Sequence, residues 1–189
     1  MWASLGMWRP AFRMRLCLAA TLSSVYGIYS GYELCENTPV PGKEEYLNSE
    51  KYELKVWDWD RPGHIIDYVT LLNRARREHP ALQEYDNLRF YEADDPNFLC
   101  YAKMTPDRSD VVLVVVNLEP FQTHETMFRF PVEDFGLESG EQFLVTELIT
   151  GQSYFWNSGE QHVELDPNWE PALIYSIKRW AHVDYGEPC

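Results

Sequence analysis

The sequence predicts a mixed fold in which a helical unit is followed by an antiparallel β-sandwich. Up to about residue 83 the pattern runs helix, short strand, long loop and helix, whereas short β-type segments follow one another beyond it. These segments start roughly 8–12 residues apart and are separated by turn signals, which is typical of antiparallel sandwiches. Because helices grouped beside a run of strands indicate two packing units, we expect domains at residues 1–83 and 84–180, with a tail at 181–189.

The first unit contains two predicted helices and one predicted strand. Pro10 marks the expected start of the first helix, because the missing N–H of proline costs little in a first turn. Residues 25–29 predict a short buried strand whose glycine allows close backbone approach. A second amphipathic helix begins near Ile65 and is closed by Pro80. Basic residues around Arg76 crowd its end, where they complement the helix dipole.

Residues 32–62 form a long connection between the predicted strand and the second helix. A loop longer than about 15 residues in a compact protein is usually functional or disordered. The tyrosines and tryptophans of this loop favour an ordered conformation, since such side chains bury large areas when they pack.

The second unit contains a series of predicted strands. The segment Val111–Val116 is a continuous apolar run, as expected of a central strand that is buried on both faces. The strands are expected at Leu88–Ala93, Phe98–Met104, Val111–Leu118, Thr123–Phe130, Phe143–Leu148, Ser153–Trp156, His162–Leu165 and Ala172–Lys178.

The composition limits the classes of partner and the compartment. A net charge of −14 argues against nucleic acid and against a membrane surface, because both need clustered Lys and Arg. No apolar run reaches the roughly 18 residues of a transmembrane helix. The run Leu16–Leu22 resembles the apolar part of a signal peptide, but it is short and no small-residue cleavage site follows. With four widely spaced cysteines read as reduced thiols, the expected location is cytoplasmic.

The residues alone give little support for a complete enzyme. The chain has no nucleophile elbow, no zinc-protease motif, no phosphate-binding loop and no dinucleotide fingerprint. Its five histidines are isolated, so neither a metal site nor a cofactor is expected. Adjacent acidic pairs such as Asp94-Asp95 are interpreted as solvated surface.

Several segments resemble the α-amylase superfamily of glycoside hydrolases (family 13). Within it, about residues 9–179 are similar to the maltosyltransferases that extend α-1,4-glucans from maltose 1-phosphate. The superfamily motifs are Tyr29-x-Gly31-x-Glu33, Leu72-Asn73-Arg74-x-Arg76-Arg77-Glu78-His79-Pro80-Ala81-Leu82 and Val114-Val115-Val116-Asn117-Leu118. The maltosyltransferase blocks are Ala19-Ala20-Thr21-Leu22-Ser23-Ser24-x-Tyr26-Gly27-Ile28-Tyr29-Ser30-Gly31-x-Glu33-Leu34-Cys35-Glu36-Asn37, Glu44-Glu45-Tyr46-Leu47-x-Ser49-Glu50-Lys51-Tyr52, and Leu148-Ile149-Thr150-Gly151-Gln152-x-Tyr154-x-Trp156 through Val163-x-Leu165-Asp166-Pro167.

The resemblance implies the terminal βα unit of an incomplete (β/α)8 barrel, followed by the β-sandwich. In this superfamily the nucleophilic Asp, the acid/base Glu and a stabilising Asp follow barrel strands four, five and seven, whereas this chain matches from just before strand eight. Retaining glycosyl transfer needs two carboxyl groups that flank the scissile bond. We therefore expect no catalytic residue in this chain and no activity from it alone, as for a truncated gene product, a split subunit or a fragment.

The resemblance also implies a donor-binding pair. In the family a Lys-Tyr pair in the loop after strand eight contacts maltose 1-phosphate, and it carries over onto Lys51 and Tyr52. Barrel active sites lie on such loops, and an ammonium group on a flexible stem suits a phosphate dianion. An exposed lysine beside a packed tyrosine is the alternative from the residues alone. The implied partners are maltose 1-phosphate and α-1,4-glucan in cytoplasmic glycogen-type synthesis, with a homodimer in the complete enzyme.

Two other functions stay open. The chain could belong to another enzyme of the superfamily, such as a trehalose synthase or a glycosidase, or it could be a glucan-binding module without chemistry. Glu33 is expected to orient the loop through hydrogen bonds, and Glu36-Asn37 are weaker candidates for lining a pocket. Four tryptophans could stack on sugar rings, although packing is the favoured role: Trp57, Trp59, Trp156 and Trp169. Because one βα unit cannot close a barrel, exposed apolar surface is expected around residues 12–29.

Overall fold

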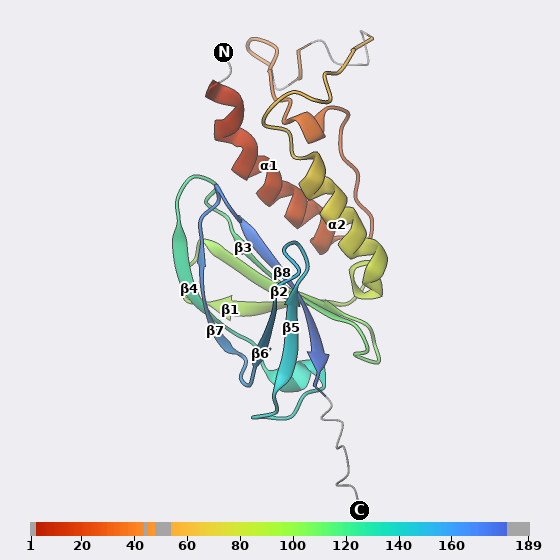
Figure 1. Ribbon diagram of the computed structural model, residues 1–189, viewed down its shortest axis with the longest axis vertical. Helices are drawn as coiled ribbons and strands as arrows, with labels where there is room; N and C mark the ends of the chain where they lie inside the picture. The colour runs from red at the N-terminus through yellow and green to blue at the C-terminus, as the bar shows by residue number, and fades with distance from the viewer. Residues whose placement is uncertain (1–2, 44, 48–53, 181–189) are drawn as a thin grey trace, which may run out of the picture.

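The computed structural model describes residues 3–43, 45–47 and 54–180 and has three layers (Figure 1). Helices α1 (Ala3–Leu22) and α2 (Ile66–Glu78) cover one face of a β-sheet. The opposite face of that sheet packs against a smaller layer of two strands, β4 and β7. Among the described residues no helix is long and apolar enough to cross a membrane.

The strands pair antiparallel throughout, in the order β6-β5-β8-β3-β2-β1-β4-β7. Strand β1 joins the two layers, because its first part pairs with β2 and its end, Glu92 and Ala93, pairs with β4. The predicted antiparallel sandwich is thus confirmed. The strands are β1 (Leu88–Ala93), β2 (Phe98–Met104), β3 (Val111–Asn117), β4 (His124–Arg129), β5 (Phe143–Glu147), β6 (Ser153–Trp156), β7 (Glu160–Leu165) and β8 (Ala172–Arg179).

Strand β3 lies between two hydrophobic cores. Val112, Val114 and Val116 face the helices, whereas Val111, Leu113 and Val115 face the second β-layer. Every residue of β3 is buried, as its uninterrupted apolar sequence predicts for a strand covered on both faces.

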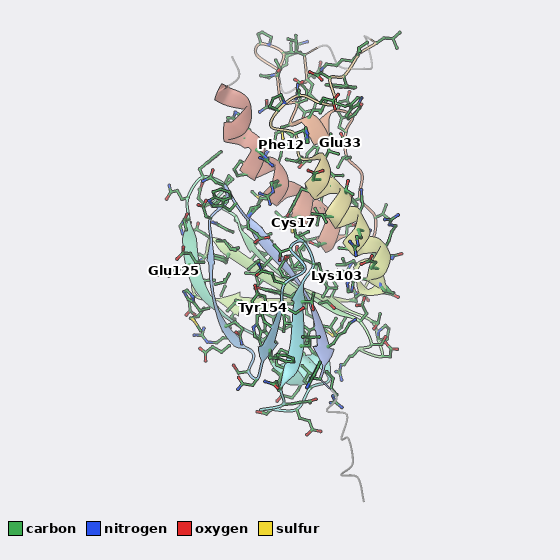
Figure 2. All side chains as sticks on the ribbon, viewed as in Figure 1. Phe12, Cys17, Glu33, Lys103, Glu125 and Tyr154 are labelled. Carbon is green, nitrogen blue, oxygen red and sulfur yellow. The ribbon has the colours of Figure 1, made fainter. Side chains whose placement is uncertain are left out.

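The core between the helices and the sheet is built by the apolar stripes of both helices. Phe12 and Leu16 of α1 and Leu72 of α2 contribute to it, and Figure 2 shows Phe12 and Cys17 along α1. Helix α2 ends at Glu78, and a short 3-10 turn (Pro80–Leu82) follows at once, as Pro80 predicts. Within the described residues, the three cysteines are buried free thiols: Cys17, Cys35 and Cys100.

The first helix starts earlier than the sequence predicts. It begins at Ala3, so that Pro10 lies inside it instead of at its first turn. Proline cannot donate a backbone hydrogen bond to the carbonyl four residues earlier, which here belongs to Gly6. Pro10 is buried against the rest of the protein, and helical segments flank it on both sides, so the helix continues past one missing bond.

The buried strand predicted at residues 25–29 is not formed. This segment has no strand partner among the described residues, and Val25 and Tyr29 are 79% and 47% exposed. A strand needs a neighbour to accept and donate its backbone hydrogen bonds. The segment instead connects α1 to a turn at residues 30–31, with a bend over residues 23–25 and no regular secondary structure over 26–29.

The predicted apolar exposure over residues 12–29 is wrong for its first part. Phe12, Met14 and Leu16 are buried, because α1 packs on α2 and on the sheet. The exposure is confined to the unpaired segment that follows α1, where Val25 and Tyr29 are the large exposed apolar residues.

Candidate functional site

The loop that carries the candidate site starts with a tight turn after residue 29. Gly31 and Cys35 both adopt left-handed backbone conformations, with φ of 85° and 54°, at the two ends of a 3-10 turn (Tyr32–Leu34). The carbonyl of Gly31 accepts hydrogen bonds from the backbone N–H groups of Leu34 and Glu36. Glycine is the residue that adopts such a conformation without steric cost, so Gly31 sets the direction of the loop.

The turn is fastened to both helices. The Tyr32 hydroxyl donates to the carbonyl of Phe12 in α1 over 2.7 Å, and the two rings lie 4.9 Å apart. The Ile65 N–H, at the start of α2, donates to the carbonyl of Glu33 over 2.7 Å. Glu33, labelled in Figure 2, therefore holds the loop through its backbone, while its buried carboxylate Oε2 has no hydrogen-bond partner among the described residues.

The second part of the loop returns over this turn. The indole of Trp57 lies directly on Gly31, where a Cβ atom would overlap it. The ammonium of Lys55 sits 4.2 Å from the centre of the Trp57 ring, in a cation–π arrangement. The Trp57 ring thus lies between the Gly31 backbone and the Lys55 ammonium.

Glu36 is the charged centre of this arrangement. Its carboxylate lies 3.5 Å from the Arg61 guanidinium and 4.0 Å from the Lys55 ammonium. Partial burial raises the pKa of Glu36, but hydrogen bonds from Thr38 and the charges of Lys55 and Arg61 outweigh it, so that the pKa lies below its ordinary value. Glu36 is therefore ionised at neutral pH and serves as a hydrogen-bond acceptor, not as a proton donor.

Glu36, Lys55 and Trp57 line a small pocket together with three tyrosines. The rings of Tyr29 and Tyr46 lie 5.6 Å apart, and Tyr46 is held by a β-bridge to Pro39. The cavity volume is about 10 Å³, which cannot enclose a sugar ring. The described residues place acceptor, cation and aromatic groups side by side around this pocket. The lining residues are Tyr29, Ser30, Tyr32, Glu36, Tyr46, Lys55 and Trp57.

The sequence predictions for this site have mixed outcomes. Lys51 and Tyr52 lie outside the described residues, so the structure does not test them. Glu36 lines the pocket as considered, whereas Asn37 is not among the lining residues.

Sequence analysis missed Lys55, which lies within this acidic and aromatic loop, two residues before Trp57. The sequence signal for Lys55 was its position two residues before an aromatic residue, Trp57.

The four candidate tryptophans divide into two groups. Trp156 packs in the core against Phe128, Phe143 and Tyr175, and Trp57 packs on the Gly31 turn. Trp59 is 48% exposed, with its ring 6.5 Å from that of Trp57, whereas Trp169 is 80% exposed and packing does not account for it. Within the described ranges, no group of three His, Cys, Asp or Glu side chains could hold a metal ion.

The fold is found in α-amylases. An alpha-amylase from Geobacillus thermoleovorans in complex with acarbose aligns with a TM-score of 0.58 at 14% identity, over 91% of this chain and 34% of that one. The maltogenic alpha-amylase AmyB from Thermotoga neapolitana aligns with a TM-score of 0.60 at 14% identity, over 91% of this chain and 37% of that one. The class of the chain is therefore an amylase-type β-domain with its two adjoining helices.

The sequence places the chain more narrowly. Residues 90–177 match the family described as "GLGE, C-terminal". The chain is 47% identical over 169 residues to an alpha-1,4-glucan:maltose-1-phosphate maltosyltransferase from Cereibacter sphaeroides, covering 89% of this chain and 25% of the relative. A maltosyltransferase from Myxococcus xanthus is 45% identical over 174 residues, covering 92% of this chain and 26% of the relative. The chain is thus similar to the C-terminal part of these maltosyltransferases, which confirms the resemblance, and it spans about a quarter of their length.

Proposed function

We propose that the chain is the C-terminal part of a retaining maltosyltransferase that moves maltosyl from maltose 1-phosphate to an α-1,4-glucan. The observation that carries the proposal is the 47% identity over 169 residues to an enzyme of that name, which spans the loop as well as the β-domain. In glycogen-type synthesis such an enzyme would work in the cytoplasm, as a homodimer.

The reacting carboxylates would be supplied from outside this chain. In retaining transfer one carboxylate attacks the anomeric carbon and phosphate leaves, and a second carboxyl group then helps the glucan hydroxyl to displace the enzyme from the sugar. The role of residues 1–83 would be to form the last βα unit of the barrel, with residues 25–29 pairing as strand eight once a neighbouring strand is present. Residues 84–180 would be the supporting β-domain.

Lys51 and Tyr52 would hold the donor phosphate. Tyr46 and Lys55, which precede and follow them in the sequence, both line the pocket. Lys51 precedes Lys55 by four residues in the sequence, and we infer that its side chain acts beside the pocket. An ammonium there would stabilise the phosphate as it leaves with the bonding electrons.

The proposal is tested by supplying the missing part. The 189-residue chain is mixed with the upstream three-quarters of the Cereibacter sphaeroides relative, and phosphate release from maltose 1-phosphate is measured with maltohexaose as acceptor. We expect phosphate release and acceptor elongation from the mixture and none from either part alone. Turnover by the 189-residue chain by itself, or none by a mixture that forms a stable complex, would contradict the proposal.

A substitution then assigns the donor contact. In the active mixture, Lys51→Ala should raise the KM for maltose 1-phosphate at least about tenfold, the equivalent of ~1.4 kcal/mol, and leave the KM for maltohexaose nearly unchanged. Lys43→Ala removes an exposed lysine of the same loop and is the matched control. Equal effects of Lys51→Ala on both substrates would remove Lys51 from the phosphate site.

A further inference from the structure

A second pocket lies where α1, the start of α2 and the loop between β7 and β8 meet. Its volume is about 330 Å³, which falls within the range of about 300–1,000 Å³ typical of small-molecule sites. It is separate from the Glu36 pocket and shares no lining residue with it. Its aromatic residues are Trp169 and Tyr68, and polar residues of both helices also line it.

Hydrogen bonds fix the backbone of Trp169. Its N–H donates to the carbonyl of Asp166 over 3.0 Å, and its own carbonyl accepts from the Arg13 guanidinium over 2.5 Å. The carboxylate of Asp166 also accepts from the backbone N–H and the side-chain amide of Asn168. The indole, 80% exposed, is thus displayed by an ordered turn, which reduces the entropic cost of binding a ligand on it.

The polar groups beside Trp169 have unused hydrogen-bonding capacity. Arg13 Nε and His64 Nδ1 are buried and have no hydrogen-bond partner among the described residues. Tyr68 is 5% exposed; its hydroxyl interacts with the Cys17 thiol, and its ring lies under the Arg13 guanidinium at 4.6 Å. Buried polar groups in native proteins are almost always paired, so two unpaired nitrogens around one pocket point to a polar ligand.

The charges of the pocket favour a neutral ligand over an anion. Arg9 and Arg13 line it, but so does Asp67. Glu170 lies close enough to interact electrostatically with Arg13 and offsets its charge where the Glu170 carboxyl is ionised. A phosphate would meet Asp67 here, whereas an uncharged polyhydroxyl compound can use donors and acceptors of both kinds.

We propose that this pocket binds a segment of α-1,4-glucan, with Trp169 stacked on a glucosyl ring and the polar side chains bound to its hydroxyl edge. Sugar rings present an apolar C–H face and a polar rim, which matches an aromatic surface bordered by Arg, His, Asp and Tyr. The inference rests on the proposed function only for the choice of glucan. The site would hold a long acceptor chain on the β-domain, away from the reacting end.

The test is a binding experiment on the 189-residue chain without donor or catalysis. The indole N–H signal of Trp169 is identified by its loss in Trp169→Ala, and maltoheptaose is titrated while NMR spectra are recorded. We expect this signal to shift on titration, retardation of the chain in glycogen gels, and roughly tenfold weaker binding for Trp169→Ala. Trp180→Ala is the matched control, because Trp180 is a tryptophan 43% exposed at the end of β8 that does not line this pocket.

Several results would contradict the proposal of a glucan site at Trp169. It is wrong if maltoheptaose leaves the Trp169 signal unmoved, if Trp169→Ala and Trp180→Ala weaken binding equally, or if inorganic phosphate moves the signal and maltoheptaose does not. Equal shifts with cellohexaose would reject selection of the α-1,4 linkage. Thermal melts of both tryptophan variants check that they are folded. His64→Ala should also weaken maltoheptaose binding, which tests the pocket independently of Trp169. Because no phosphate release is measured, failure of this site and failure of the proposed transferase activity are separate outcomes.

Discussion

At the scale of single residues, Arg76 shows how one side chain connects the two helices. It is placed on α2, but its guanidinium donates to carbonyls at and beyond the end of α1: those of Ala20, Ser23 and Ser24. It also donates to Leu82. The last carbonyls of a helix have no partner within the helix. The sequence suggested that Arg76 acts on the dipole of its own helix, α2. In the structure its guanidinium instead donates hydrogen bonds to carbonyls at the C-terminal end of α1.

Replacing Arg76 should therefore destabilise the packing of the helices. Arg76→Ala leaves several carbonyls without their donor, and hydrogen bonds to a charged group contribute about 1.5–3 kcal/mol. We expect the free energy of unfolding to fall by roughly 2–4 kcal/mol in urea denaturation. Arg77→Ala, which removes the neighbouring exposed arginine, should change it by less than about 0.5 kcal/mol. Equal effects from the two variants would contradict this role.

Glu170 makes stability depend on pH. Burial, followed by the nearby charge of Glu147, raises its pKa from 4.5 to about 7, and Arg13 only partly opposes this. Between these two values the unfolded chain loses the proton and the folded chain keeps it. The contribution of Glu170 to stability is therefore neutral below about pH 4.5, becomes unfavourable as the pH rises, and levels off above about pH 7.

The variant Glu170→Gln should remove this pH dependence. At pH 8 we expect it to be more stable than the unmodified chain by about 1 kcal/mol, a value reduced because solvent reaches part of the side chain. At pH 4 the two should coincide. Urea unfolding at both pH values measures the difference, and a gap that is the same at pH 4 and pH 8 would show that Glu170 does not titrate in this way.

At the scale of elements, the β-domain was largely predictable and the first unit was not. Every strand of the sheet is found where alternation and turn residues placed it, because a sandwich is built from local pairings whose partners all lie within residues 88–179. The apolar run of β3 even indicated that both of its faces are covered. The segment 25–29 reads as a buried strand but is not one here, because burial and pairing depend on neighbours that local sequence does not supply.

The same reason limits prediction of the candidate site. Glu36 could be proposed from a family motif, but its pairing with Arg61 depends on a return of the loop that no periodicity indicates. Gly31 was noticed as a motif residue, and its reason became clear only with Trp57 packed on it. Contacts between residues about 25 apart in an irregular loop are set by tertiary packing.

The central strand offers a direct test of the packing between the layers. Val114 is fully buried in the core shared with the helices. Val114→Ala removes two methyl groups from that core, and we expect about 2 kcal/mol lower stability in denaturant unfolding. If Val114→Ala changes stability by less than about 0.5 kcal/mol, the helices do not pack on β3 as described.

At the scale of the whole molecule, the distribution of exposed apolar side chains indicates what the chain is built to contact. The helices bury their apolar stripes on the sheet, so one core is shared by helices and sheet and the other lies within the β-domain. The segment between α1 and the Gly31 turn is different, because Val25 stays 79% exposed and the backbone has no strand partner among the described residues. An unpaired apolar segment of this kind can serve as a template for pairing with another strand.

A charge at Val25 should therefore leave the chain intact and impair its assembly. In the 189-residue chain, Val25→Asp should change the free energy of unfolding by less than about 0.5 kcal/mol, because the side chain lies in solvent. In the mixture with the upstream part of the Cereibacter sphaeroides relative, the carboxylate would be buried as residues 25–29 pair, which costs several kcal/mol unless it is partnered. The concentration of chain that gives half-maximal phosphate release should then rise at least about tenfold, equivalent to ~1.4 kcal/mol, whereas Val25→Ile should behave like the unmodified chain. Equal complementation by Val25→Asp would mean that this segment stays in solvent in the assembled enzyme, and that the barrel strand has to be sought elsewhere in the chain.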